Sequence, residues 1–192
     1  MTGLETPEQV AARYDGRAAT YDDDDPHHLI ARAVAEFVDP TGVRDVLDAA
    51  TGTGLVLRAL KLRLAEDARL TGVDLSARML EVARAQTPDA TFLVGDATAL
   101  PWEDGSFDLV TCVTAIHLMP DTDVALREWS RVLRPAGRIV IATFTTVPGW
   151  GHLVSVADEA PAAGLTVLRS IGWRAPAEAD FPELVIAELA RG

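Results

Sequence analysis

Apolar and polar positions follow two different periods along this chain. Short apolar runs with strand character alternate with stretches in which apolar residues return every third or fourth position, the period of a helix packed on a sheet. The predicted strands cover residues 43–49, 68–73, 91–94, 107–113, 138–144, 166–170 and 184–189. The predicted helices cover residues 55–65, 77–86 and 123–133. This alternation predicts the α/β class, with a doubly wound, seven-stranded and mostly parallel sheet.

A further helix is predicted before the first strand. Asp25 precedes Pro26 as its N-cap, and an apolar face then continues to a helix end near Asp39. We expect the preceding polar segment, residues 12–25, to be mobile. The four aspartates at 22–25 are interpreted as a solvated loop, because consecutive carboxylates cannot all face one ion and no second cluster completes the ligand set. We therefore expect no metal site.

Composition and charge narrow the classes of partner. With 192 residues, 48% of them hydrophobic and 24% charged, the chain fits one globular domain. The 17 basic and 29 acidic side chains give a net charge of −12, which repels a phosphate backbone, so we expect no nucleic-acid partner. No apolar run approaches the ~20 residues of a membrane helix, so we expect no membrane partner either.

Cys112 is the only cysteine, so no disulfide can form within the chain. Its place in the apolar run FDLVTCVTAI predicts a buried and inert thiol. The N-terminus lacks a basic segment followed by an apolar one, as a secretory signal would require. These features fit a reducing compartment, and we expect a cytoplasmic protein.

A glycine turn follows the first predicted strand. Residues 46–54 read VLDAATGTG, and the next strand ends on Asp74 in RLTGVDLS. This pairing indicates a nucleotide-bearing cofactor, because glycines let the backbone approach a ligand and an acid accepts hydrogen bonds from ribose hydroxyls. Leu57 occupies the position of the third glycine of a dinucleotide fingerprint, which disfavours NAD, and no P-loop lysine is present. A cofactor with adenosine but without a pyrophosphate remains.

The turn resembles that of class I S-adenosylmethionine-dependent methyltransferases, usually Asp-x-Gly-x-Gly-x-Gly, except that Ala50 replaces the first glycine. Residues 94–121, VGDATALPWEDGSFDLVTCVTAIHLMPD, and 127–144, REWSRVLRPAGRIVIATF, resemble later motifs of the small-molecule branch that includes the ubiquinone and menaquinone C-methyltransferases. The resemblance covers about residues 43–145, roughly half the chain. It implies a Rossmann-like fold, S-adenosylmethionine as cofactor, and methyl transfer to O, N or C of a small molecule.

The resemblance also divides the chain into one methyltransferase domain, residues 1–192, with three parts. Residues 1–40 form an N-terminal cap segment that folds over the cofactor in this family. Residues 41–145 form the cofactor-binding core, and residues 146–192 form a substrate-side part. Because residues 147–164 are short for the substrate lid of this branch, a homodimer in which a second subunit supplies the lid is a hypothesis.

Five residues around the turn and the next strand are expected to hold the methionine and ribose portions of the cofactor. Asp48 organises the turn, through hydrogen bonds to backbone N–H groups or to the cofactor's amino group. Ala50, Gly52 and Gly54 form the turn, and the two glycines keep side chains away from the ligand. Asp74 accepts hydrogen bonds from the ribose hydroxyls at the carboxyl end of its strand.

Four further residues are expected at the adenine. Asp96, in VGDA, accepts from the adenine amino group, and the Ala97 N–H meets a ring nitrogen. Leu75 and Met79 pack on the adenine face, although the helical spacing of Met79 also fits a core position.

Catalytic groups are harder to assign, because alignment and desolvation can supply much of the catalysis of methyl transfer. His117 follows the fourth predicted strand and is either a general base or a residue that bonds the following loop. Segments that surround the substrate in the family carry further aromatic and histidine side chains. They are Tyr14, Tyr21, His27, His28, Trp150 and His152.

Two alternatives to methyl transfer stay open at this point. One is a non-catalytic cofactor-binding subunit that stabilises an active partner, and the other is an enzyme that runs a cyclisation or decarboxylation on the same fold. The Ala-, Arg- and Asp-rich composition suggests a high-GC bacterial source, and hence an acceptor from specialised metabolism.

Overall fold

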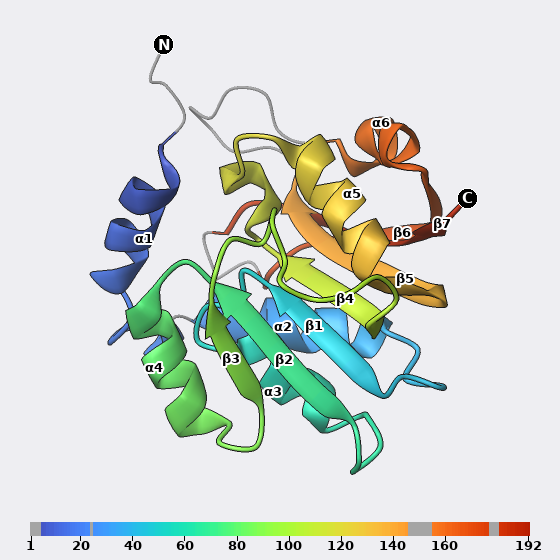
Figure 1. Cartoon of the computed structure of the whole chain (residues 1–192). Helices are drawn as coiled ribbons and strands as arrows, with labels where there is room; N and C mark the ends of the chain where they lie inside the picture. Colours follow the sequence, from blue (N-terminus) through green and yellow to red (C-terminus); the bar gives the residue numbers. More distant parts are fainter. Residues whose placement is uncertain (1–4, 24, 146–154, 177–180) are drawn as a thin grey trace.

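A computed structural model describes residues 5–23, 25–145, 155–176 and 181–192, and these residues contain one seven-stranded sheet. Its strands are β1 (Asp45–Ala49), β2 (Arg69–Asp74), β3 (Thr91–Val94), β4 (Phe107–Val113), β5 (Leu133–Phe144), β6 (Leu165–Trp173) and β7 (Leu184–Arg191). The strand order is β3-β2-β1-β4-β5-β7-β6 (Figure 1). Strands β1 to β5 pair in parallel, whereas β7 is antiparallel to β5 and β6. The predicted fold class is therefore confirmed.

Helices cover both faces of this sheet (Figure 1). The α-helices are α1 (Pro7–Asp15), α2 (Asp25–Phe37), α3 (Leu55–Lys61), α4 (Ala77–Gln86), α5 (Thr122–Val132) and α6 (Val156–Glu159), and the 3-10 helices are η1 (Tyr21–Asp23), η2 (Ile116–Leu118) and η3 (Ala160–Ala163). Successive residues of β1 point to opposite faces: Val46 joins the apolar cluster under α2 and α3, and Leu47 the cluster under α5. Both faces of the central strands are thus buried, as a doubly wound sheet requires.

Some boundaries differ from the predicted ones for local reasons. The fifth strand begins at Leu133 instead of residue 138, because Leu133 pairs with Phe107 across an irregularity in the register of β4 and β5. Helix α5 consequently ends at Val132. The helix predicted over 55–65 ends at Lys61, where the chain tightens into a turn closed by hydrogen bonds to the Leu60 carbonyl.

The N-terminal segment is more regular than its polar sequence predicted, because α1 continues to Asp15 and η1 covers Tyr21–Asp23 within the range 12–25 that is predicted to be mobile. Helix α1 begins with a capping box, in which Thr6 accepts from the Gln9 N–H and the Gln9 side chain accepts from the Thr6 N–H. The Thr-Pro-Glu-Gln sequence carries this signal. Asp22 is half-buried and bonds to the glycine turn, and α2 begins at Asp25 itself.

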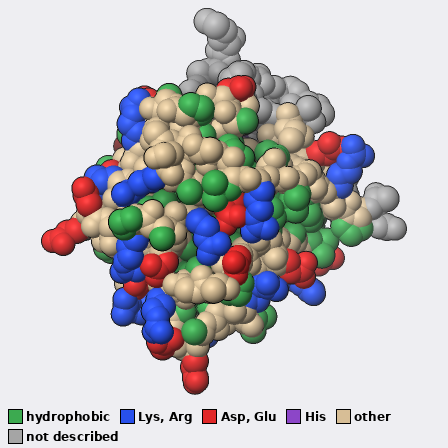
Figure 2. Space-filling model, turned by 90° about the vertical axis from the view of Figure 1, so that its right-hand side faces the viewer, with side chains coloured by type: hydrophobic (Ala, Val, Ile, Leu, Met, Phe, Trp, Pro, Cys, Tyr) green, Lys and Arg blue, Asp and Glu red, His purple; other side chains and the backbone are tan. Residues whose placement is uncertain are grey.

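The surface charges and the single cysteine can also be located in the structure. On the face in Figure 2, basic and acidic side chains are interspersed. Among the described residues, no helix is long and apolar enough to cross a membrane. Cys112 is fully buried in β4, as predicted, and burial raises the pKa of its thiol. This thiol is therefore protonated at neutral pH.

Candidate active site

Two neighbouring cavities open where the carboxyl ends of β1, β2, β3 and β4 meet the N-terminal segment. In Figure 1 the arrowheads of β1, β2 and β4 point toward the side on which α1 lies. The first cavity is lined by the predicted residues Ala50, Gly52, Asp74, Leu75, Met79, Asp96, Ala97, Tyr14 and Tyr21. The second is lined by the predicted residues Asp48, Ala50, Gly52, Tyr21 and His27. The fold therefore gathers most of the predicted cofactor residues around two cavities that share Tyr21, Ala50 and Gly52 as lining residues.

The Asp74 carboxylate links the two loops at this edge of the sheet. Its Oδ2 accepts a hydrogen bond of 2.8 Å from the Gly52 N–H, and its Oδ1 accepts one of 2.8 Å from the Ser76 N–H. Burial raises the pKa of Asp74 above its usual value. Since each carboxylate oxygen has two acceptor sites, both oxygens retain capacity for a ligand hydroxyl in the cavity.

Asp48 is a buried acid beside the same turn. It is 1% exposed and accepts hydrogen bonds from the Thr51 hydroxyl at 2.7 Å and from the Thr111 hydroxyl at 2.6 Å. Burial raises the pKa of this carboxyl to about 7, against the opposing effect of the two hydroxyl donors. Asp48 thus contacts the turn through the Thr51 hydroxyl, and not through the backbone N–H groups that were one of the two predicted sets of partners; the other, the cofactor's amino group, stays a prediction.

The backbone of the turn adopts left-handed conformations. Gly52 has φ +55°, and a Cβ added there would meet no atom within 4 Å, so a side chain would extend into open space. Ala50 has φ 57°, a conformation that costs a non-glycine residue roughly 1–2 kcal/mol. Gly54 has φ +80° and is the N-cap of α3. A Cβ added at Gly54 would lie in van der Waals contact with the side chains of Ala83 and Phe92. Gly54 lines neither cavity, and the left-handed backbone at the start of α3 is the feature that favours glycine there.

Gly72 of β2 supports the turn from below. A Cβ added at Gly72 would lie 2.7 Å from Cγ2 of Thr51 and 2.8 Å from Cδ1 of Phe92. The Thr51 N–H in turn donates to the Val73 carbonyl at 3.0 Å. The close approach of the turn to β2 therefore depends on a residue without a side chain.

The loop after β3 places Asp96 and Ala97 at the first cavity. Asp96 Oδ1 accepts from the N–H and the hydroxyl of Thr98, both at 2.8 Å, which is a local turn closed by the side chain. The fully buried Trp129 of α5 donates its indole N–H to the Ala97 carbonyl at 2.9 Å. The orientation of the Ala97 peptide is thus set from α5.

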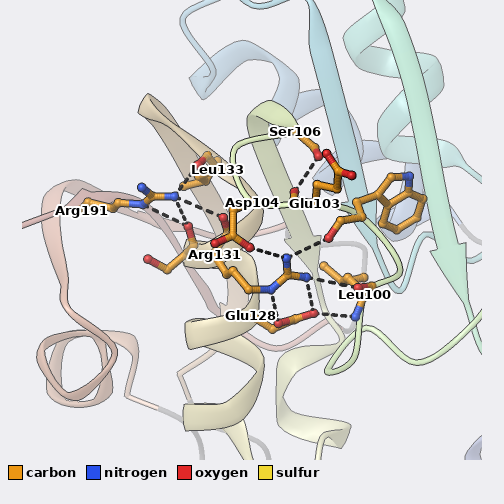
Figure 3. A network of polar contacts seen from close by, with 10 residues as sticks. Leu100, Glu103, Asp104, Ser106, Glu128, Arg131, Leu133 and Arg191 are labelled. Atoms are coloured by element: carbon orange, nitrogen blue, oxygen red, sulfur yellow. Dashed lines mark hydrogen bonds and ion pairs between the residues drawn. The ribbon is translucent and has the colours of Figure 1, made fainter.

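A polar network braces the next part of this loop (Figure 3). The Arg131 guanidinium donates to the carbonyls of Leu100 and Trp102 and to the carboxylates of Glu128 and Asp104. Glu128 also accepts from the Leu100 N–H at 2.7 Å. The side chains of α5 therefore hold this loop through the loop's backbone at Leu100 and Trp102 and through the Asp104 side chain.

Six ring side chains form a continuous series beside the cavities. The centroid distances are 6.2 Å for Tyr14–Tyr21, 4.4 Å for Tyr21–His27, 5.8 Å for His27–Phe181, 5.6 Å for Phe181–Phe144 and 5.1 Å for Phe144–His117. These rings come from the N-terminal segment, α2, η2, the end of β5 and the residues just before β7. Only the folded chain brings them together.

His117 lies on η2 and is not among the described lining residues, although Ala115 and Leu118 beside it are. Burial, with a smaller contribution from the Arg13 charge, lowers the pKa of His117 to about 4. The imidazole is therefore neutral at physiological pH and able to accept a proton. Its assignment as a base stays a prediction.

Of the remaining substrate-side candidates, the structure describes only His28, which lines neither cavity. The Nε2 of His28 lies 2.8 Å from the Asp22 carbonyl, in an exposed position. Trp150 and His152 lie outside the described residues. Sequence reasoning missed Val10 and Ala11, which line the first cavity on the same face of α1 as Tyr14. The capping box at Thr6 was the signal that could have revealed this helix.

The first cavity fits the adenosine part of S-adenosylmethionine. Asp74 offers acceptors for two hydroxyls, and Gly52 leaves room for a ligand against the backbone. Leu75, Met79 and Ala97 offer apolar surface for a flat ring. Met79 is 1% exposed, so it serves the core and the cavity wall together.

Comparison with known proteins agrees with this arrangement. The model of a methyltransferase domain matches residues 47–141. A demethylmenaquinone methyltransferase of Streptomyces griseus is 37% identical over 159 residues, which are 80% of this chain and 67% of that protein. A ubiquinone/menaquinone biosynthesis C-methyltransferase of Hahella chejuensis is 36% identical over 153 residues, 73% of this chain and 61% of that protein.

Among solved structures, magnesium protoporphyrin IX methyltransferase of Synechocystis with bound S-adenosylmethionine superposes with a TM-score of 0.77 at 17% identity, over 100% of both chains. At this identity the likeness concerns the fold. The sequence matches and the fold together confirm the predicted family, enzyme class and cofactor. The chain belongs to the class I S-adenosylmethionine-dependent methyltransferases and resembles, within them, the ubiquinone and menaquinone C-methyltransferases.

Proposed function

We propose that this enzyme methylates a small aromatic acceptor of the reduced-quinone type, at a ring carbon. The observation that carries the proposal is the meeting of the glycine turn, Asp74 and Asp96 with Tyr14 and Tyr21 of the N-terminal segment around the first cavity. The names of the relatives, which refer to demethylmenaquinone and to ubiquinone/menaquinone biosynthesis, support this acceptor class.

The proposed cofactor roles follow from the donors and acceptors at each loop. Asp74 holds the ribose hydroxyls, and Asp96 with the Ala97 N–H holds the adenine edge. Asp48 and the glycine turn border the second cavity, where the methionine portion would lie. When bound, S-adenosylmethionine supplies a methyl group already activated by its sulfonium charge, so that alignment and desolvation provide most of the catalysis.

The acceptor is proposed to bind against the ring series that runs from Tyr14 to His117. Flat rings pack well on one another in offset and edge-to-face arrangements, and each such contact adds about 0.5–1.5 kcal/mol beyond burial. Tyr14 and Tyr21 line the first cavity and would exclude water from the reacting atoms. His117, neutral at physiological pH, would take the proton that the acceptor carbon loses when its new bond to the methyl carbon forms.

Turnover on a defined acceptor tests this function. The purified chain is incubated anaerobically with methyl-labelled S-adenosylmethionine and a reduced naphthoquinone that carries a short prenyl chain and lacks the ring methyl group. We expect equal amounts of methylated quinone and S-adenosylhomocysteine by mass spectrometry. As a matched control, Asp89→Asn changes an exposed carboxylate paired with Lys61 and should leave the rate unchanged.

The other outcomes discriminate between the parts of the proposal. Binding of S-adenosylhomocysteine without methylated quinone would overturn this acceptor and direct the search to phenolic or amine acceptors of specialised metabolism. Absence of binding would overturn the cofactor site. The homodimer stays a hypothesis of its own, and a monodisperse monomer with full activity in sedimentation would end it.

A further inference from the structure

The dipeptide Tyr-Asp occurs twice in the N-terminal segment, as Tyr14-Asp15 and as Tyr21-Asp22. In both pairs the tyrosine lines the first cavity. In both pairs the aspartate forms a hydrogen bond to a loop that carries a proposed cofactor residue. The four-aspartate run therefore begins with a residue that has a specific partner.

Asp15 binds the loop after β2. Its Oδ1 accepts from the Ser76 hydroxyl at 2.5 Å and from the Arg78 N–H at 3.2 Å. Ser76 is the N-cap of α4, and its own N–H donates to Asp74. A carboxylate at this position also interacts favourably with the helix dipole of α4. Asp15 is thus connected through Ser76 to Asp74, the residue proposed to bind the ribose.

Asp22 binds the glycine turn. Its Oδ1 accepts from the Thr53 hydroxyl at 2.5 Å, and its Oδ2 accepts from the Arg58 guanidinium at 2.5 Å. Arg58 also donates to the Thr53 carbonyl at 2.8 Å. Thr53 is 1% exposed and stands between the two glycines of the turn. The contact therefore reaches the backbone that would approach the cofactor.

Apart from Tyr21, which packs against the apolar cluster under α2 and α3, little apolar burial holds this segment in place. Helix α1 has no buried residue, and Ala18 is the one buried apolar side chain among residues 5–23 of the described chain. The Arg17 guanidinium lies 5.7 Å from the Tyr14 ring centroid and 5.4 Å from that of Tyr21, which ties the two tyrosines together. The position of the segment over the cavity therefore depends largely on its polar contacts, together with the packing of Tyr21.

We propose that Asp15 and Asp22 are positioning residues that hold Tyr14 and Tyr21 over the cofactor, one aspartate on each cofactor loop. This inference rests on the proposed cofactor site. The same two loops form the cofactor site, so a bound ligand that orders these loops also stabilises the contacts of Asp15 and Asp22 with them. By linkage, those contacts strengthen ligand binding by the same factor. Loss of the Asp15 and Asp22 carboxylates, which we call the anchors, should therefore weaken cofactor binding although neither side chain contacts the cofactor.

The test measures Asp15→Asn, Asp22→Asn and the double variant. The matched control is Asp23→Asn, because Asp23 lies in the same 3-10 helix as Asp22 and its exposed side chain forms no hydrogen bond among the described residues. Calorimetry with S-adenosylhomocysteine should show roughly tenfold weaker binding for each anchor variant, as expected for the loss of a hydrogen bond to a charged group. Asp22→Glu, which restores a carboxylate, should recover part of the affinity.

A second readout follows the segment itself. Trypsin cleaves after Arg13 and Arg17, and mass spectrometry of the released peptides reports how open the segment is. S-adenosylhomocysteine should protect these sites in the wild type and in Asp23→Asn but not in the double variant. A general loss of stability would not produce this pattern, because it would speed cleavage with and without ligand alike.

The outcomes separate this inference from the proposed function. If the wild type fails to bind S-adenosylhomocysteine, or if Asp74→Asn binds it equally well, the cofactor site itself is wrong. If the wild type binds, Asp74→Asn does not, and the double anchor variant retains wild-type affinity and protection, the positioning role of Asp15 and Asp22 is refuted.

Discussion

Replacing Asp74 by asparagine probes the proposed ribose contact with the smallest change in shape. The carboxylate accepts backbone N–H groups from Gly52 and Ser76 and still has acceptor sites that face the first cavity. Asparagine keeps one oxygen acceptor and turns the other position into a donor. It therefore cannot serve both backbone donors and both ribose hydroxyls.

The expected loss follows from the value of the hydrogen bonds. A hydrogen bond to a charged group contributes about 1.5–3 kcal/mol and one between neutral groups about 0.5–1.5 kcal/mol. Exchanging two charge-assisted contacts to ribose for at most one neutral contact should cost about 2–4 kcal/mol of binding. At 1.4 kcal/mol for each tenfold change, the dissociation constant for S-adenosylhomocysteine should rise about 30-fold to several hundredfold.

Titration calorimetry of Asp74→Asn and the wild type measures this difference directly. Asp89→Asn, which changes an exposed acid that lines neither cavity, serves as the control and should bind as the wild type does. Thermal unfolding without ligand shows whether the variant is folded. A folded Asp74→Asn protein whose affinity lies within about twofold of the wild type would refute the ribose assignment.

Four further outcomes are expected. Burial raises the pKa of Asp48 to about 7, from about 3.9 in the unfolded chain. Between these two values the folded state binds more protons, so the free energy of unfolding falls as the pH rises. Urea unfolding should therefore show that, between about pH 5 and pH 8, the wild type loses about 2–3 kcal/mol more of its free energy of unfolding than Asp48→Asn does. Gly72→Ala should lower the free energy of unfolding by about 1–3 kcal/mol through overpacking, whereas Gly16→Ala, where the closest approach of an added Cβ is 3.5 Å, should change it by less than about 0.5 kcal/mol. Trp129→Phe should cost about 1–3 kcal/mol in urea unfolding, because a buried carbonyl loses its donor, and should also weaken S-adenosylhomocysteine binding in calorimetry. His117→Ala should slow methyl transfer, and the wild-type rate should fall only as pH approaches about 4, where His117 becomes protonated; a rate unaffected by the substitution at every pH would exclude it as the base.

The sequence alone determined the order and type of most elements. Strand and helix periods, the glycine turn at Gly52 and the acids at the ends of strands are local signals, written within a few residues of each other. They sufficed to predict the sheet, and to predict that Asp74 and Asp96 would reach one edge of it, because parallel strands end on the same side. The resemblance of the glycine turn to that of class I S-adenosylmethionine-dependent methyltransferases added the cofactor.

Only the tertiary structure decided which distant groups meet. In the sequence Asp22 is the first of four equivalent acids, and it becomes distinct only when Thr53 and Arg58 come within hydrogen-bond distance. The raised pKa of Asp48 likewise depends on its burial among strands. The donation from Trp129 to the Ala97 carbonyl joins residues 32 positions apart. Contacts of this kind depend on packing across the fold, which no local pattern encodes.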